Sequence, residues 1–167
     1  MALGGGCEIS LHADKVVAAA ETYIGLVEFG VGVIPGGGGS KEMALRASDS
    51  FKKNDVELNI LQENFLTIGT STSAYEAFDL GLLQKGKDVV VVNKERQIAT
   101  AKAHAILMAE AGYTKPIHRT DVKVLGKQAL GMFLAGTDAM EASRYISEHD
   151  HKIANKLAYV MAGGDLS

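Results

Sequence analysis

The chain reads Ala2-Leu3-Gly4-Gly5-Gly6-Cys7-Glu8 and, further on, Gly25-Leu26-Val27-Glu28-Phe29-Gly30-Val31-Gly32-Val33-Ile34-Pro35-Gly36-Gly37-Gly38-Gly39. Each stretch places one glutamate, Glu8 or Glu28, beside a glycine-rich turn. Glycine lets the backbone approach a ligand closely or adopt a positive φ, at an entropic cost elsewhere. A carboxylate beside such a turn can meet a substrate whose oxygen is held by the N–H groups of the turn. The pair therefore predicts acid–base chemistry by Glu8 and Glu28 on one bound molecule.

Each stretch taken alone also has a plainer interpretation. A run of glycines before a glutamate can be a tight strand-to-helix connection with a solvated carboxylate in the first helical turn, and either glutamate can be a salt-bridged structural residue. Short motifs of this kind also match by chance. The two stretches together, with apolar sequence between them, are far more specific than either one.

Together the two stretches resemble the signature of the crotonase (enoyl-CoA hydratase/isomerase) superfamily. The resemblance continues in Phe65-Leu66-Thr67-Ile68-Gly69-Thr70 and in Ser73-Ala74-Tyr75-Glu76-Ala77-Phe78-Asp79-Leu80-Gly81-Leu82-Leu83. It covers about residues 1–110. The remainder is closer to the enoyl-CoA hydratase part of bacterial fused proteins that also carry a 3-hydroxyacyl-CoA dehydrogenase.

The resemblance implies an enoyl-CoA hydratase of fatty-acid β-oxidation, with an acyl-CoA thioester as substrate. It makes Glu8 and Glu28 the catalytic pair that adds water to a trans-2-enoyl-CoA, with Glu8 activating the water and Glu28 tied to the α-carbon proton. It makes Gly5 the oxyanion-hole donor to a thioester enolate. The expected substrate-binding residues are Gly4, Gly36 and Gly37. No cofactor is expected in this chain, and NAD is expected only in a separate domain of the parent protein.

Members of the family have a long stretch before the first glycine turn, which supplies half of the stacked core and a second oxyanion donor. We therefore expect the chain to be a fragment of the parent, inactive alone and associating as a homo-oligomer. Two alternatives stay open: an enoyl-CoA isomerase or another crotonase using the same enolate, and an inactive folded fragment that acts only in association.

Composition limits the classes of function. The chain has 167 residues, 47% of them hydrophobic and 22% charged, which is ordinary for a globular domain. A net charge of −3 gives no basic field for nucleic acid. No apolar run is long enough to span a bilayer, and no signal peptide is expected. The single cysteine, Cys7, excludes an internal disulfide and predicts a cytoplasmic location. A small packing residue is favoured over a nucleophile at Cys7.

Three other groups of residues have some of the features of a binding site. The glycines at 36–39, followed by Ser40-Lys41, do not match the Walker order, and no dinucleotide-binding fingerprint is present. In His149-Asp150-His151 the two imidazoles lie two positions apart, so on a helix they diverge and cannot share a metal. No metal site is expected. Lys123 and Lys127 can meet CoA phosphates, but an ordinary charged face is favoured.

The expected fold class is α/β: the C-terminal part of a crotonase-like (ββα) spiral fold over residues 1–112, then a helical region over 113–167 used in association and in covering the active site. A capping box is expected at Ser73–Glu76, with Gly81 just past the end of its helix. Extended segments are expected at 15–20, 22–26 and 88–92, the last buried on both faces. Helices are expected at 7–13, 40–47, 55–66, 93–111, 122–135 and 138–161. The apolar face of the helix at 93–111 is expected to contain Ile98, Ala101, Ala105 and Met108, and the helix at 138–161 is expected to open with the capping pattern Asp138-x-x-Glu141.

Overall fold

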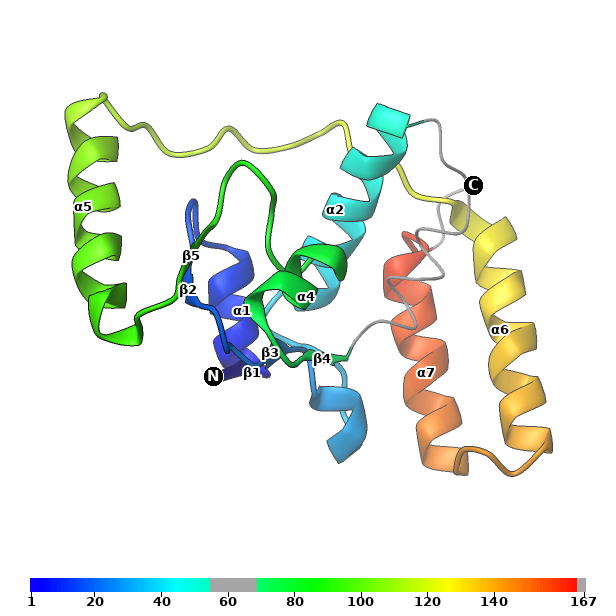
Figure 1. Cartoon of the computed structure of the whole chain (residues 1–167). Helices are drawn as coiled ribbons and strands as arrows, with labels where there is room; N and C mark the ends of the chain where they lie inside the picture. Colours follow the sequence, from blue (N-terminus) through cyan, green and yellow to red (C-terminus); the bar gives the residue numbers. More distant parts are fainter. Residues whose placement is uncertain (55–68, 165–167) are drawn as a thin grey trace.

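A computed structural model describes residues 1–54 and 69–164 (Figure 1). The strands are β1 (Ala2–Leu3), β2 (Val17–Ala19), β3 (Ile24–Gly25), β4 (Thr70–Ser71) and β5 (Val89–Val91). The helices are α1 (Gly5–Leu11), α2 (Gly39–Asn54), α4 (Ala74–Asp79), α5 (Gln97–Glu110), α6 (Gly126–Ala142) and α7 (Glu148–Met161), with the 3₁₀ turns η1 (Glu28–Val31) and η2 (Lys94–Arg96). No helix in this part of the chain has the length and apolarity that crossing a membrane requires.

Two small sheets hold the N-terminal half together. In one sheet β3 lies between β1, to which it is parallel, and β4, to which it is antiparallel. In the other sheet β2 and β5 pair in parallel, with Ala18 opposite Val90. Parallel strands need a crossover between them, and α1 follows β1 directly to provide one. The first sheet thereby places the starts of α1 and η1 side by side.

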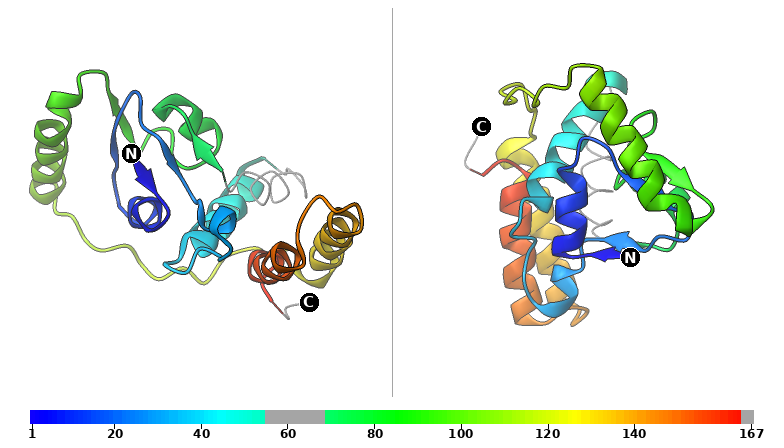
Figure 2. Two further views of the ribbon diagram at one scale, coloured as in Figure 1. Left: turned by 90° about the horizontal axis from the view of Figure 1, so that it is seen from below. Right: turned by 90° about the vertical axis from the view of Figure 1, so that its left-hand side faces the viewer.

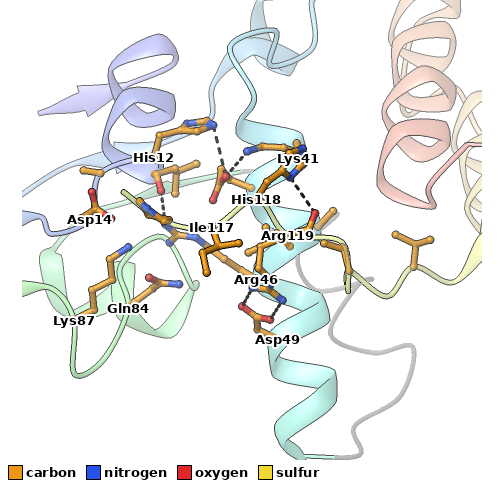
Figure 3. Close-up of a pocket in the computed structure, with 18 of the residues that line it drawn as sticks. His12, Asp14, Lys41, Arg46, Asp49, Gln84, Lys87, Ile117, His118 and Arg119 are labelled. Carbon is orange, nitrogen blue, oxygen red and sulfur yellow. Dashed lines mark hydrogen bonds and ion pairs between the residues drawn. The ribbon is translucent and has the colours of Figure 1, made fainter. Parts of the chain in front are cut away.

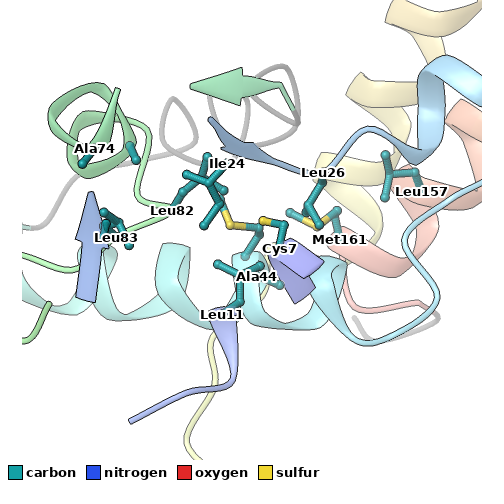
Figure 4. Packing of buried hydrophobic residues seen from close by; sticks show 13 residues of the cluster. Cys7, Leu11, Ile24, Leu26, Ala44, Ala74, Leu82, Leu83, Leu157 and Met161 are labelled. Atoms are coloured by element: carbon teal, nitrogen blue, oxygen red, sulfur yellow. The ribbon is translucent and has the colours of Figure 1, made fainter. Parts of the chain in front are cut away.

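A single apolar cluster joins the strands to α1, α2, α4 and α7 (Figure 4). Cys7 and Leu11 enter it from α1, Ile24 and Leu26 from the segment around β3, and Met161 from α7. These side chains are between 0% and 2% exposed, so each contributes about 1.5–3 kcal/mol of apolar burial. The last helix is therefore part of the same core as the glycine-rich segments.

The C-terminal helices form an antiparallel pair at one end of the molecule, while α5 lies at the opposite end (Figures 1 and 2). The pair has a small core of its own, in which Ala129 and Phe133 of α6 meet Ala158 of α7. Thr137 of α6 donates a hydrogen bond to Asn155 of α7. α7 also packs on α2 and on η1, so this helical pair reaches the segment that carries Glu28.

The predicted boundaries of the last two helices were wrong. α6 runs from Gly126 to Ala142, so Asp138 lies inside a helix and does not cap one. α7 begins after Ser147, whose side chain and that of Asp150 form the reciprocal bonds of a capping box. An aspartate at the third helical position makes the return bond that glutamate usually makes.

Two predictions of burial were also wrong. β5 is half-buried along its length and Val92 just beyond it is 83% exposed. Among the described residues, β2 alone pairs with this strand. Within α5 no residue is buried, and Ile98, expected on its apolar face, is 83% exposed. The strands β2, β3 and β5 and the helix α5 were predicted, whereas the short strands β1 and β4 and the exposure of β5 and α5 were not.

Other predictions of individual helices and strands were closer to the observed elements. α1 starts two residues before the predicted 7–13, and β2 lies inside the predicted 15–20. Ser73 caps α4 and Gly81 follows its end with a φ of +74°, although the Glu76 carboxylate binds Thr72 rather than the backbone of Ser73. The helix predicted at 40–47 is longer and extends to Asn54. The helix predicted at 55–66 lies outside the described residues.

Candidate active site

Glu8 is held by the glycine-rich loop that precedes α2. It sits in the first turn of α1 and is 6% exposed. Its Oε1 accepts hydrogen bonds from the N–H of Gly37 at 2.8 Å and from the N–H of Gly39 at 2.9 Å. Charge-assisted bonds of this kind are about twice as strong as neutral ones. One carboxylate oxygen is therefore fixed by backbone donors.

The close approach of this loop explains why it needs glycine. A Cβ on Gly37 would lie 2.5 Å from Oε2 of Glu8, and a Cβ on Gly39 would lie 2.7 Å from Cδ2 of Leu26. Real Cβ contacts essentially never fall below 3.0 Å. By contrast, a Cβ on the exposed Gly36 would find its nearest atom at 4.0 Å. The glycines that touch Glu8 thus have a steric role that Gly36 lacks.

Glu28 is the first residue of η1 and is half-buried. Its Oε2 is buried with no hydrogen-bond partner among the described residues. Gly4, with a φ of +54°, caps α1 directly against it, since a Cβ there would lie 3.3 Å from Oε1 of Glu28. A buried carboxylate oxygen without a donor is costly. It is therefore available for a donor from a bound molecule.

Cys7 links the two glutamates. Its thiol is fully buried, and its pKa is raised to about 12, first by burial and then by the charge of Glu28, with a smaller contribution from Glu8. Both carboxylates therefore disfavour the ionised form of the same buried thiol. A thiol in this position is protonated at neutral pH, which fits packing and not nucleophilic attack.

The remaining predicted site residues divide into two groups. Gly4 faces Glu28 and Gly37 faces Glu8, so both belong to the cluster around the carboxylates. Gly5 lies in the exposed first turn of α1, where backbone N–H groups have no acceptor inside the helix. Its N–H is therefore free for an oxyanion, and a Cβ there would meet nothing within 4 Å. The roles of Gly5 and Gly36 toward a substrate stay predictions.

Several known proteins are similar in sequence to this chain. The chain is 42% identical over 167 residues to a probable 3-hydroxyacyl-CoA dehydrogenase of Bacillus subtilis, a match to 98% of this chain and 20% of that protein. It is 33% identical over 105 residues to a probable mitochondrial enoyl-CoA hydratase of Dictyostelium discoideum, covering 63% of this chain and 33% of the relative. The chain thus resembles the enoyl-CoA hydratase members of the crotonase superfamily. No family model matches it.

The chain thus spans between a fifth and a third of the length of these two relatives. A crystal structure of an enoyl-CoA hydratase subunit from Geobacillus kaustophilus also aligns, at 24% identity and a TM-score of 0.47, over 96% of this chain and 50% of its own. The match to the Bacillus relative includes the C-terminal helices, whereas the match to the Dictyostelium relative is shorter.

The chain also has a cavity of about 790 Å³ that neither Glu8 nor Glu28 lines (Figure 3). It lies among α1, α2 and the connection that precedes α6. Its charged groups are largely paired with one another: Arg119 binds Asp49 at 2.8 Å, and Lys41 binds Glu42. Such internal pairing leaves little net field for a ligand.

Arg46, in the wall of this cavity, connects separate parts of the fold, a role that the sequence did not indicate. It is 9% exposed, and burial lowers its pKa. Its guanidinium donates to the carbonyl oxygens of Leu11 at 2.9 Å, Gly81 at 2.7 Å and Leu82 at 3.1 Å. Arg46 therefore ties the end of α1 to the turn that follows α4. No motif around an isolated arginine predicts such a role.

The two histidines of α7 diverge as predicted. His149 Nε2 lies 2.7 Å from the carbonyl oxygen of Gly32, whereas His151 lies between Asp138 and Glu141 of α6. Across the described residues there is no group of three side chains able to hold a metal. Lys123 lies before α6, where its backbone N–H donates to Ser48, and a role for Lys123 or Lys127 toward CoA stays a prediction.

Proposed function

We propose that this segment supplies the two carboxylates and one oxyanion donor of an enoyl-CoA hydratase site. The reaction is addition of water to a trans-2-enoyl-CoA. The observation that supports it most is the contrast between the two carboxylates. Glu8 has one oxygen bound by two amides, whereas Glu28 has one oxygen that is buried and has no donor among the described residues.

In this proposal Oε1 of Glu8 stays bound to the loop amides and Oε2 accepts a proton from the attacking water. The water oxygen forms its bond to the β-carbon of the enoyl thioester. The electron pair of the double bond moves to the thioester oxygen, where the N–H of Gly5 stabilises the enolate. Glu28, protonated at the start, delivers the proton that the α-carbon gains when the enolate collapses, and the proton taken up by Glu8 returns to Glu28 by way of solvent before the next turnover. The overall change is one water added and no oxidation.

The isomerase is the second candidate, because one detail favours it. Glu28 has the free oxygen, whereas Glu8 is held by the loop. Moving a double bond within an enoyl thioester needs a single carboxylate that takes a proton at one carbon and returns it at another. The two activities differ in whether water enters the product.

Several properties of the whole protein belong to the same proposal. The acyl-CoA thioester is its substrate, and the NAD-dependent step implied by the dehydrogenase name of the Bacillus relative is assigned to another part of the protein. We propose a cytoplasmic location. We also propose that the segment associates with itself through apolar side chains left exposed on α5 and near η1, such as Ile98 (83% exposed) and Val31 (76% exposed). Light scattering at several concentrations tests association, which a monomer at every concentration would contradict.

The activity is tested with two proteins: the chain alone, and an exchanged protein, which is the Bacillus relative in which this chain replaces the matching segment. Hydration of crotonyl-CoA is followed by loss of the enoyl absorbance, with the unmodified relative as control. The exchanged protein is expected to hydrate crotonyl-CoA, and the chain alone to be at least about 10²-fold slower because it brings a single oxyanion donor. Two results would contradict the hydratase assignment. One is an unmodified relative that hydrates crotonyl-CoA while the exchanged protein does not, and the other is an exchanged protein that isomerises a 3-enoyl-CoA without hydrating crotonyl-CoA.

A further inference from the structure

The C-terminal helix pair makes a direct polar contact with the turn that carries Glu28. His149, in the first turn of α7, lies with Nε2 2.7 Å from the carbonyl oxygen of Gly32, a partner 117 residues away in sequence. A carbonyl only accepts, so the ring donates its Nε2–H. Gly32 ends η1 with a φ of +83°, and a Cβ there would lie 3.3 Å from Nε2. Glycine at this place therefore permits both the bend and the approach of the ring.

The turn that His149 contacts has little other support. It contains four residues, and it is closed by the Gly32 N–H bonded to Phe29 and the Val33 N–H bonded to the Glu28 carbonyl, each at 3.1 Å. Phe29 packs against the main core, but none of the four residues is buried. A single exposed 3₁₀ turn has poor hydrogen-bond geometry. An external bond therefore matters more here than in a long helix.

The two candidate catalytic groups differ in how they are held. The Glu8 carboxylate is fixed directly by two backbone amides. The Oε2 of Glu28 has no such donor among the described residues, so the place of this carboxylate depends on the backbone of η1. The donor side of the contact is firmly anchored, because α7 starts in a capping box and ends with Leu157 and Met161 in the main core.

We propose that His149 is a positioning residue for Glu28: by donating to Gly32 it fixes η1 against α7 and so holds the carboxylate at the reacting carbon. This inference rests on the proposed function, in which Glu28 transfers the α-carbon proton. It makes the C-terminal helices part of the geometry of their own chain's site. A displacement of about 1 Å at a catalytic group can cost about 10²-fold in rate.

The variants are His149→Leu, which removes the donor, and His149→Gln, whose amide N–H can reach the same carbonyl. His151→Leu is the matched control, because it lies on the same helix but contacts α6. Two quantities are measured: hydrogen exchange of the peptide covering residues 28–34 in this chain, and kcat and KM for crotonyl-CoA in the exchanged Bacillus protein. Glu28→Gln is measured beside them.

His149→Leu is expected to raise exchange in residues 28–34 and to lower kcat by about 3- to 10-fold with little change in KM, as loss of one hydrogen bond predicts. His149→Gln is expected to restore both, and His151→Leu to alter neither. Equal losses in the two leucine variants, or unchanged exchange in His149→Leu, would overturn the positioning role. If Glu28→Gln keeps full kcat, the proposed function fails. Hydrogen exchange of residues 28–34 then decides on its own whether the His149–Gly32 bond holds η1.

Discussion

Alanine at Gly37 should destabilise the protein through Glu8, whereas alanine at its neighbour Gly36 should not. A Cβ at Gly37 would meet Oε2 of Glu8 at 2.5 Å and Cδ at 3.0 Å, so the carboxylate has to move. That movement strains or breaks the bond from the Gly37 N–H to Oε1, now 2.8 Å long. A Cβ at Gly36 has no neighbour closer than 4.0 Å.

The difference between the two variants isolates the contact with Glu8. Each replacement restricts the unfolded chain and so stabilises the protein by about 0.4–1 kcal/mol, and this term is the same for both. A hydrogen bond to a charged group contributes about 1.5–3 kcal/mol. Gly37→Ala is therefore expected to be less stable than Gly36→Ala by about 1.5–3 kcal/mol. Urea unfolding followed by circular dichroism measures this free energy.

A double-mutant cycle with Glu8→Ala tests the cause. Once the carboxylate is absent, the Cβ of Ala at position 37 has nothing to displace, so Gly37→Ala should cost no more than Gly36→Ala. Two results would refute the reasoning: equal stability of the two alanine variants in the parent, or an unchanged cost of Gly37→Ala when Glu8 is alanine. Either would mean that the loop does not hold this carboxylate.

Two further predictions concern buried groups near the site. Burial raises the pKa of Cys7 from 9.0 to about 12, so above pH 9 the folded thiol keeps a proton that the unfolded thiol loses, and the free energy of unfolding should fall there but not below pH 9. In urea unfolding at several pH values, the decline should be smaller for Cys7→Ala, by about 2 kcal/mol near pH 10.5. Parallel declines in the two proteins would contradict this. Arg46→Met removes three hydrogen bonds to carbonyl oxygens and should lower the free energy of unfolding by about 3 kcal/mol or more. The control Lys41→Met, at an exposed side chain, should change it by less than about 0.5 kcal/mol. Similar urea midpoints for the two variants would exclude the bridging role of Arg46.

The sequence singled out both glutamates and the glycines near them, and their roles toward a substrate stay predictions. In the structure Gly4 lies against Glu28 and Gly37 donates to Glu8. That the amides of Gly37 and Gly39 bind Glu8 was not predicted. In a run of four glycines, local pattern does not tell which N–H faces a given side chain.

The missed features depend on partners far away in sequence. The valine run at 88–92 has the composition of a strand buried on both faces, but burial is decided by what packs against it. In the part of the chain that the structure describes, β2 alone pairs with this strand, which is half-buried. The pattern Asp138-x-x-Glu141 resembles a capping box, yet the chain turns at Ser147 instead. That the two histidines of α7 diverge follows from helix geometry. That one of them meets Gly32 follows only from the tertiary fold.

The kinetics of Glu8→Gln, Glu28→Gln and the double variant test the central claim most directly, because the claim is that the two carboxylates act together on one water and one thioester. In the exchanged Bacillus protein each single variant should lower kcat for crotonyl-CoA hydration by about 10²–10⁴, since the amide keeps the shape but cannot transfer the proton. The double variant should be no slower than the worse single variant by more than a small factor. Near-parental kcat in both single variants would show that the glutamates are structural and contradict the account.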